Sequence, residues 1–268
     1  MHPIEHLRYV ARAPGADPVE VAMGAADALA GISRDPAAAL VAARRLVEHH
    51  PTNAPLWSVC AHAVTSMDPY RDVDDLARRI ANDTTATNLV DALDGASTIC
   101  MIGWSGHLVD ALARRGDIHA LVIDSLGDGQ DALRYLSRRE VSCELVAPEG
   151  LASAAECADA TILSALAVGN DSVLCAGGSL ALAAVAYCVE QPVWMVASEG
   201  TRLPDGLFTA MVAGVRDRPD PWASGFDVVP HALVTSVFGP TITSGTADTL
   251  ARMKACPAAD ELLRRSVV

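Results

Sequence analysis

Apolar residues recur at three- and four-residue spacing through the first third of the chain, which is the period of an amphipathic helix. This spacing predicts helices over Val19–Ile32, Pro36–His49, Ala54–Val64 and Val73–Leu93. Asp35 and Pro36 fit a helix start, because an aspartate N-cap accepts backbone N–H bonds and proline suits the first helical position. The first third of the chain is therefore predicted to be helical.

From Ser97 onward the pattern changes to short apolar runs. The runs that predict buried strands are Thr98–Ile102, Ala120–Asp124, Cys143–Ala147, Ala160–Ser164 and Val193–Ala197. Helices are predicted over Leu108–Arg115, Gln130–Arg139 and Leu180–Glu190, and a turn-rich connection over Ala165–Ala176. This alternation favours a parallel sheet with right-handed crossovers. We therefore predict an α/β protein with a helical N-terminal region, residues 1–94, and a Rossmann-like parallel-sheet domain, residues 95–268.

The end of the chain has a less regular pattern. It predicts a surface turn over Arg216–Pro221, an extended segment over Phe226–Pro230, one helical turn over His231–Val234, and closing helices over Thr246–Cys256 and Ala258–Arg265.

Composition narrows the class of protein. The chain has 268 residues, 51% of them hydrophobic but only 4% aromatic, and a formal net charge of −13. An acidic body repels DNA and anionic membranes at long range, although backbone amides can still form a local anion site. The seven cysteines form no C-x-x-C pair, and the chain begins with no secretory signal pattern. We therefore expect a cytoplasmic protein with reduced thiols, no membrane span and no metal or cofactor.

Two glycine-rich turns are the candidate binding sites. Gly103, Trp104, Ser105, Gly106 and His107 follow the first predicted strand directly. Such a turn brings backbone N–H groups and a hydroxyl close to a ligand, although an ordinary turn that relieves strain is the simpler interpretation.

The second turn opens the most apolar helix of the chain. It contains Gly177, Gly178 and Ser179, and a helix N-terminus of this kind suits an anion such as phosphate. Residues that the same sheet edge would bring near it are Ser164, Asn170, Asp171 and, after the last predicted strand, Arg202. A helix start whose glycines only allow close packing is the alternative.

Two catalytic or cofactor interpretations are weaker. Cys100 and Cys175 are nucleophile candidates with Asp171, but both fall where buried, inert thiols are expected. Asp124 ends the second strand where a ribose-binding carboxylate of a dinucleotide site would lie, but the full G-x-G-x-x-G pattern is missing.

Four segments, in order, resemble the family of translation initiation factor 2B regulatory subunits. This family includes methylthioribose-1-phosphate isomerase and ribose-1,5-bisphosphate isomerase. The similar segments are His50–Trp57, Met101–Gly106, Ala176–Ser179 and Phe226–Thr235. The resemblance implies a helical N-terminal region, a Rossmann-like C-terminal domain and, usually, a homodimer built through that domain.

The departures from the family pattern concern its chemistry. Where the isomerases have a catalytic cysteine and aspartate, the resemblance places Gly103 and Leu166. Basic or phosphate-holding positions of the family fall on His50, Ala176 and Met23–Ala25. Neither Gly103 nor Leu166 can perform acid–base catalysis.

We therefore expect a regulatory, non-catalytic protein that binds a small anionic, sugar-phosphate-like or nucleotide ligand, or a partner protein. The alternative is a divergent aldose-phosphate isomerase acting on a ribose-1-phosphate derivative.

Overall fold

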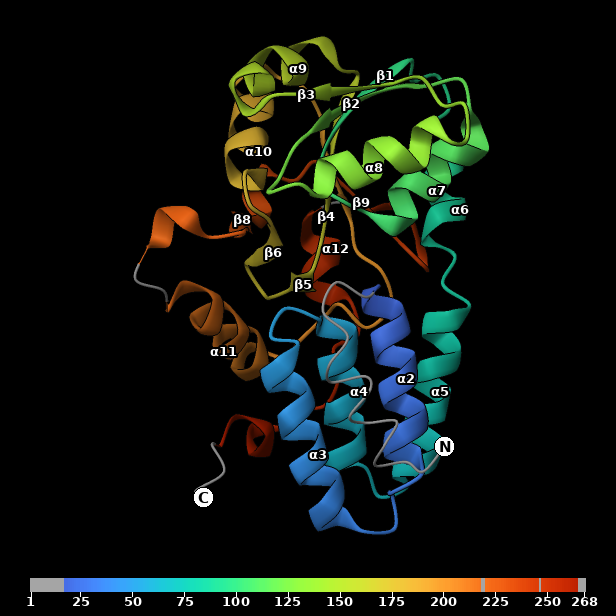
Figure 1. The fold of residues 1–268 in the computed structure, drawn as a ribbon, viewed down its shortest axis with the longest axis vertical. Helices are drawn as coiled ribbons and strands as arrows, with labels where there is room; N and C mark the ends of the chain where they lie inside the picture. The colour runs from blue at the N-terminus through green and yellow to red at the C-terminus, as the bar shows by residue number, and fades with distance from the viewer. Residues whose placement is uncertain (1–16, 218–219, 246, 265–268) are drawn as a thin grey trace. The chain divides into compact units, whose positions relative to one another are not determined.

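The computed structural model describes residues 17–217, 220–245 and 247–264 (Figure 1). Of the sequence predictions, the segment before residue 17, parts of the Arg216–Pro221 turn, and Thr246 and Arg265 lie outside these residues. Packing groups the described residues into two compact units, and neither is one continuous stretch. The first contains residues 17–83, 199–217 and 253–264, and the second contains the rest.

The first unit is helical. Its helices are α2 (Pro18–Ala30), α3 (Pro36–His49), α4 (Ala54–Thr65), α5 (Pro69–Ala81), α11 (Asp205–Arg216) and the short η4 (Asp260–Leu263). Helix α4 is buried along most of its length and packs against α2, α3 and α5. A helix that is apolar all round needs neighbours on every side, so α4 forms the centre of this unit.

Helices α2 to α5 begin in the same way. Each has proline in its first turn and an acidic or amide N-cap whose side chain accepts a backbone N–H bond; the caps are Asp17, Asp35, Asn53 and Asp68. Asp35, for example, accepts from the N–H of Ala38 at 3.0 Å, which confirms the helix start predicted there. These helix starts are therefore set by local sequence.

The prediction of one helix over Val73–Leu93 is wrong. Helix α5 ends at Ala81, and a separate helix, α6 (Thr85–Ala92), belongs to the second unit. The Asn82 amide donates to the carbonyl of Arg78 at 2.7 Å. The same carbonyl also accepts the backbone N–H of Asn82 at 3.1 Å, so Asn82 caps the end of the helix although the apolar spacing continues.

The second unit is built on a seven-stranded sheet with the order β10-β9-β7-β4-β1-β2-β3. The strands are β1 (Thr98–Ile102), β2 (His119–Ile123), β3 (Cys143–Val146), β4 (Ala160–Ser164), β7 (Val193–Val196), β9 (Ser236–Gly239) and β10 (Ile242–Gly245). Six strands are parallel and β10 is antiparallel to β9. The predicted Rossmann-like parallel sheet is thus confirmed.

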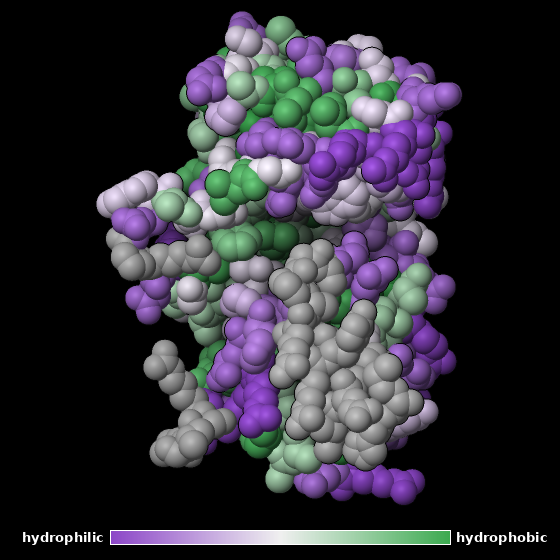
Figure 2. Space-filling model, in the orientation of Figure 1, coloured by the Kyte–Doolittle hydropathy of each residue, from purple (hydrophilic) through white to green (hydrophobic). Residues whose placement is uncertain are grey.

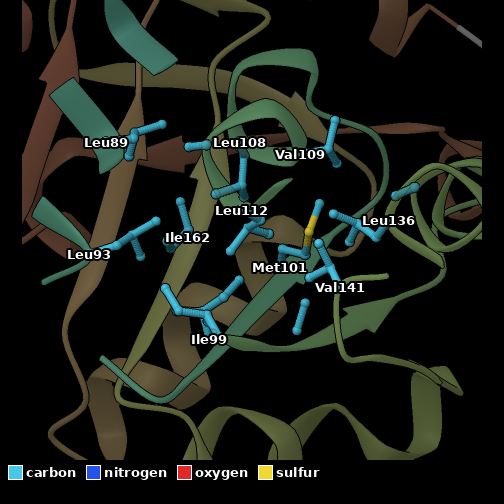
Figure 3. Close-up of a cluster of buried hydrophobic side chains, with 14 of the residues drawn as sticks. Leu89, Leu93, Ile99, Met101, Leu108, Val109, Leu112, Leu136, Val141 and Ile162 are labelled. Atoms are coloured by element: carbon cyan, nitrogen blue, oxygen red, sulfur yellow. The ribbon is translucent and has the colours of Figure 1, made fainter. Parts of the chain in front are cut away.

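Helices cover both faces of this sheet (Figure 1). They are α6, α7 (Gly106–Arg115), α8 (Asp128–Ser137), α9 (Leu151–Cys157), α10 (Ser179–Cys188) and α12 (Ala247–Arg252), with short turns η1 (Pro148–Gly150), η2 (Pro221–Ala223) and η3 (His231–Leu233). Figure 3 shows the core between α6, α7 and the sheet, which contains Leu89 and Leu112 from the helices and Ile99 and Met101 from β1. Alternate residues of β1 thus face this layer, as expected for a strand covered on both faces.

The connection predicted over Ala165–Ala176 is also wrong. It contains β5 (Ala167–Val168) and β6 (Ser172–Ala176), which form a small antiparallel sheet with β8 (Phe226–Pro230). Strand β6 pairs along its whole length with β8, and the partners are about fifty residues apart in the sequence. Long-range pairing of this kind leaves no local pattern from which it could be predicted.

The closing helices are shorter than predicted. Within the described residues α12 ends at Arg252 and η4 is a single short turn, whereas η3 confirms the helical turn predicted at His231. Among the residues that the structure describes, no helix combines the length and the apolar character needed to cross a bilayer.

Candidate functional site

Four turns meet at one edge of the second unit, at the ends of β1, β2, β4 and β6. Gly103 follows β1 with φ +64°, and its N–H donates to the carbonyl of Ile123 at 3.0 Å. A Cβ added to Gly103 would lie 3.4 Å from the Cβ atoms of both Ser125 and Ala176. The positive φ favours glycine at this position, and the contacts show that the turns after β1, β2 and β6 lie next to one another. We call the turns 103–107, 124–129, 164–166 and 176–180 the carboxyl edge.

Two of the predicted site residues form a hydroxyl pair at this edge. The Ser164 hydroxyl, at the end of β4, donates to the hydroxyl of Ser105, the N-cap of α7. The chain runs outward from β1 through β2 and β3, and then in the opposite direction from β4 through β7 and β9. The β1–β4 boundary is therefore the switch point of the sheet, where doubly wound folds bind their ligands.

The other residues of the turn 103–107 point to different neighbours. Gly106 begins α7 and His107 lies half-buried in its first turn. The Trp104 ring instead packs edge-on against Tyr135 of α8, with centroids 5.5 Å apart. Tyr135 donates to Asp110, and the Arg139 guanidinium lies 3.6 Å over its ring. Trp104 is thus held in an aromatic contact between α7 and α8.

The start of α10 carries a carboxylate of the chain itself. Gly178 has φ +94°, and the Asp227 carboxylate accepts from the N–H groups of Gly178 at 2.9 Å and Leu180 at 3.0 Å. The Gly177 carbonyl accepts from the Ser125 hydroxyl at 2.8 Å. Of the donors predicted to hold a phosphate, the N–H of Gly178 is therefore already bonded to Asp227 and that of Gly177 to the carbonyl of Gly225.

Helix α8 is capped in the same way. The Asp124 carboxylate accepts from the N–H of Gly129 at 3.1 Å, so the candidate ribose-binding residue is a helix cap. Within the described residues, no side chain caps α7. Its N-terminus, beside Ser105 and Ser164, is thus the helix start at this edge that retains its dipole for a ligand.

Asn170 and Asp171 lie elsewhere. Both are exposed in the turn between β5 and β6, at the end of β6 opposite to Gly177. Five extended residues span about 17 Å at roughly 3.3 Å per residue, so Asp171 does not reach the turn that begins α10.

The remaining predicted residue, Arg202, belongs to the first unit. Its side chain is buried and donates to the carbonyl of Leu203. Burial lowers the pKa of this guanidinium, while the neighbouring Asp205 and Cys256 act in the opposite direction.

The two candidate thiols are buried. Cys100 lies within β1, where burial raises its pKa to about 12. Cys175 lies within β6, and burial together with the charge of Asp227 raises its pKa as well. A nucleophilic cysteine needs a thiolate, which both environments disfavour at neutral pH.

Alkylation should distinguish these thiols from the surface ones. With iodoacetamide at about pH 8, we expect the exposed Cys157 and Cys188 to react first and Cys100 and Cys175 to stay protected until the protein unfolds. Peptide mass spectrometry with and without urea measures the order. Modification of Cys100 in the folded protein as fast as that of Cys188 would contradict the burial argument.

Sequence reasoning did not single out the residues that organise this edge. Asp227 was noted only within a longer segment and Ser125 was not singled out; their partners Gly178 and Gly177 are 49 and 52 residues away. The described residues contain no group of three histidine, cysteine or acidic side chains arranged to hold a metal.

Solved structures share this fold. Translation initiation factor eIF-2B from Pyrococcus horikoshii OT3 superimposes with a TM-score of 0.71 at 16% identity, over 89% of this chain and 97% of that one. The chain has the fold of the initiation factor 2B subunits. The eIF2B beta–delta tetramer of Chaetomium thermophilum gives a TM-score of 0.71 at 14% identity, over 93% of this chain and 92% of that one. The eIF2B beta structure from the same organism gives a TM-score of 0.68 at 13% identity, over 93% of this chain and 89% of that one.

A scan of family models and a search of curated proteins by sequence found no match. The initiation-factor-2B-like fold is therefore supported by backbone geometry and by the order of the four similar segments, while the side chains at the carboxyl edge must carry any functional argument.

Proposed function

We propose that this initiation-factor-2B-like protein binds a small sugar- or nucleoside-containing ligand at the carboxyl edge and does not transform it. The observation that carries the proposal is the Ser105–Ser164 hydroxyl pair at the switch point, beside a helix start without a side-chain cap. Hydroxyls and backbone N–H groups can orient a polar ligand, and this location is the usual one for ligands in such sheets.

The absence of turnover is inferred from the reactive groups. By the family resemblance the catalytic thiol and carboxylate positions fall on Gly103 and Leu166, and the N–H of Leu166 is bonded to the carbonyl of Leu174. Cys100 and Cys175 are buried, and Asp171 lies at the far end of β6. The part of the chain that the structure describes thus offers no thiolate and carboxylate facing each other across the edge.

Ligand screening tests the binding. Thermal unfolding is measured with sugars, nucleosides and their phosphate esters, and we expect one of these classes to raise the melting temperature. The stabilisation should fall in Ser105→Ala and Ser164→Ala but not in Ser153→Ala, whose hydroxyl is on the exposed side of α9. No stabilisation by any class would leave only a regulatory role through a partner protein.

The isomerase alternative is tested in the same samples. We expect no conversion of ribose-1-phosphate derivatives; conversion that is lost in Cys100→Ser or Cys175→Ser would favour the enzyme instead.

We further propose a cytoplasmic homodimer formed through the second unit, as the resemblance implies. Light scattering after gel filtration measures the mass against 27.9 kDa for one chain.

A further inference from the structure

The charge at the carboxyl edge is negative. The turns 103–107, 124–129, 164–166 and 176–180 contain no lysine or arginine, but they include Asp124 and Asp128, and Asp227 lies against the last of them. The surface over α8, which begins at Asp128, is hydrophilic in Figure 2. An anionic ligand group would therefore meet carboxylates and no fixed basic side chain from these turns.

Two of these carboxylates also use the donors that an anion would need. Asp227 accepts two N–H bonds at the start of α10, and Asp124 accepts one at the start of α8. A phosphate would have to displace a carboxylate that is covalently part of the chain and already in place. Both helix starts are thus closed to a ligand anion.

Asp128 adds a charge without a partner. Its Cβ lies 3.8 Å from the Cβ position at Gly103, between the turns after β1 and β2. Its carboxylate makes no hydrogen bond or ion pair with any other described residue, whereas the next acid on the helix, Asp131, pairs with Arg134. Partial burial raises the pKa of Asp128, with further contributions from Asp131 and Asp124. The electrostatic potential near Gly103 is therefore negative, and water reaches this region only in part.

We propose that the carboxyl edge selects uncharged, hydroxyl-rich ligands of the sugar or nucleoside class and rejects their phosphate esters. This inference rests on the proposed function and further specifies that the ligand carries no charge. The hydroxyls of Ser125 and Ser164 already donate to Gly177 and Ser105, so they can accept from a ligand hydroxyl but have no proton left for an anion. The Ser105 hydroxyl can still donate. A carboxylate at about 8 Å weakens binding of each negative ligand charge by about two- to threefold in bulk water, and by more where water is excluded.

Matched ligand pairs test the selection. The melting temperature and calorimetric affinity are measured for ribose against ribose 5-phosphate and for adenosine against adenosine 5′-monophosphate. We expect the uncharged member of a binding pair to bind at least about tenfold more tightly, since three carboxylates act together. Added salt should narrow the gap by strengthening only the phosphate ester, because screening weakens repulsion.

Charge-neutralising variants locate the cause. Asp128→Asn should raise the affinity for the phosphate ester severalfold relative to that for the uncharged ligand, and so narrow the gap within a pair. Glu156→Gln, which removes the same charge from the exposed side of α9, should change neither affinity. Tighter binding of the phosphate ester by the native protein, or equal effects of the two variants, would overturn the inference. If no member of either pair binds, the proposed function itself fails, which is a separate result.

Discussion

Gly129→Ala is expected to lower the free energy of unfolding of the second unit by about 3 kcal/mol. A Cβ at this position would lie 2.8 Å from the Cα of Asp124 and 2.9 Å from the carbonyl oxygen of Ile123. These are backbone atoms, which cannot rotate away as the end of a side chain can. The first turn of α8 would therefore have to move away from the end of β2, and the cap from Asp124 would be lost with it.

Gly106→Ala is the matched control for this prediction. Gly106 also lies in the first turn of a helix of the same unit, but a Cβ there meets nothing within 4 Å. Neither glycine has a positive φ, so the two variants differ in contact and not in backbone conformation. Urea denaturation should show a large loss for Gly129→Ala and a change near zero for Gly106→Ala. Similar losses in both would contradict the close-approach argument, because alanine has the higher helix propensity and no contact opposes it at Gly106.

Asp227→Ala is expected to lower the free energy of unfolding by about 2 kcal/mol, because two N–H groups at the start of α10 lose a charged acceptor. Asp227→Asn retains one acceptor oxygen and should lose about half as much. The side chain comes from β8, so the loss reports the contact between the small sheet and α10 and not a local cap.

The control for Asp227 is Asp171→Ala. Asp171 is also an aspartate next to the small sheet, but it is exposed, and its structural contact is a carbonyl that accepts from the N–H of His231, which alanine keeps. A surface substitution of this kind should change the free energy of unfolding by no more than about 0.5 kcal/mol. Thermal or urea unfolding of the three variants measures their order of stability. An Asp227→Asn variant as stable as the native protein would exclude charge-assisted capping as the source of the stability.

Much of the fold follows from local pattern. The strands β1, β2, β3, β4 and β7 and the helices α7, α8 and α10 all lie within a few residues of their predicted bounds. Strands of a parallel sheet that is covered on both faces are continuous apolar runs, and such runs are recognisable without knowledge of their neighbours. The break between α5 and α6 was missed because the apolar spacing runs through Asn82, the residue that caps the end of α5.

The candidate site could be predicted only in part. The glycine turns at Gly103 and Gly177 mark where the backbone must approach closely, and both lie at the predicted sheet edge. The sequence could not show that Trp104 packs on Tyr135, that β6 carries Asn170 and Asp171 away from this edge, or that Asp227 returns to cap α10. Each of these depends on a partner outside the local segment.

By itself, the sequence determined the α/β class, the parallel strands and the positions of the glycine turns, because hydrophobic periodicity and backbone freedom are properties of short segments. Only the tertiary structure decided which donors at the carboxyl edge are still available to a ligand. That outcome depends on side chains such as Asp227, which lie on strands far away in the sequence. The local hydrophobic pattern contains no information about these long-range contacts.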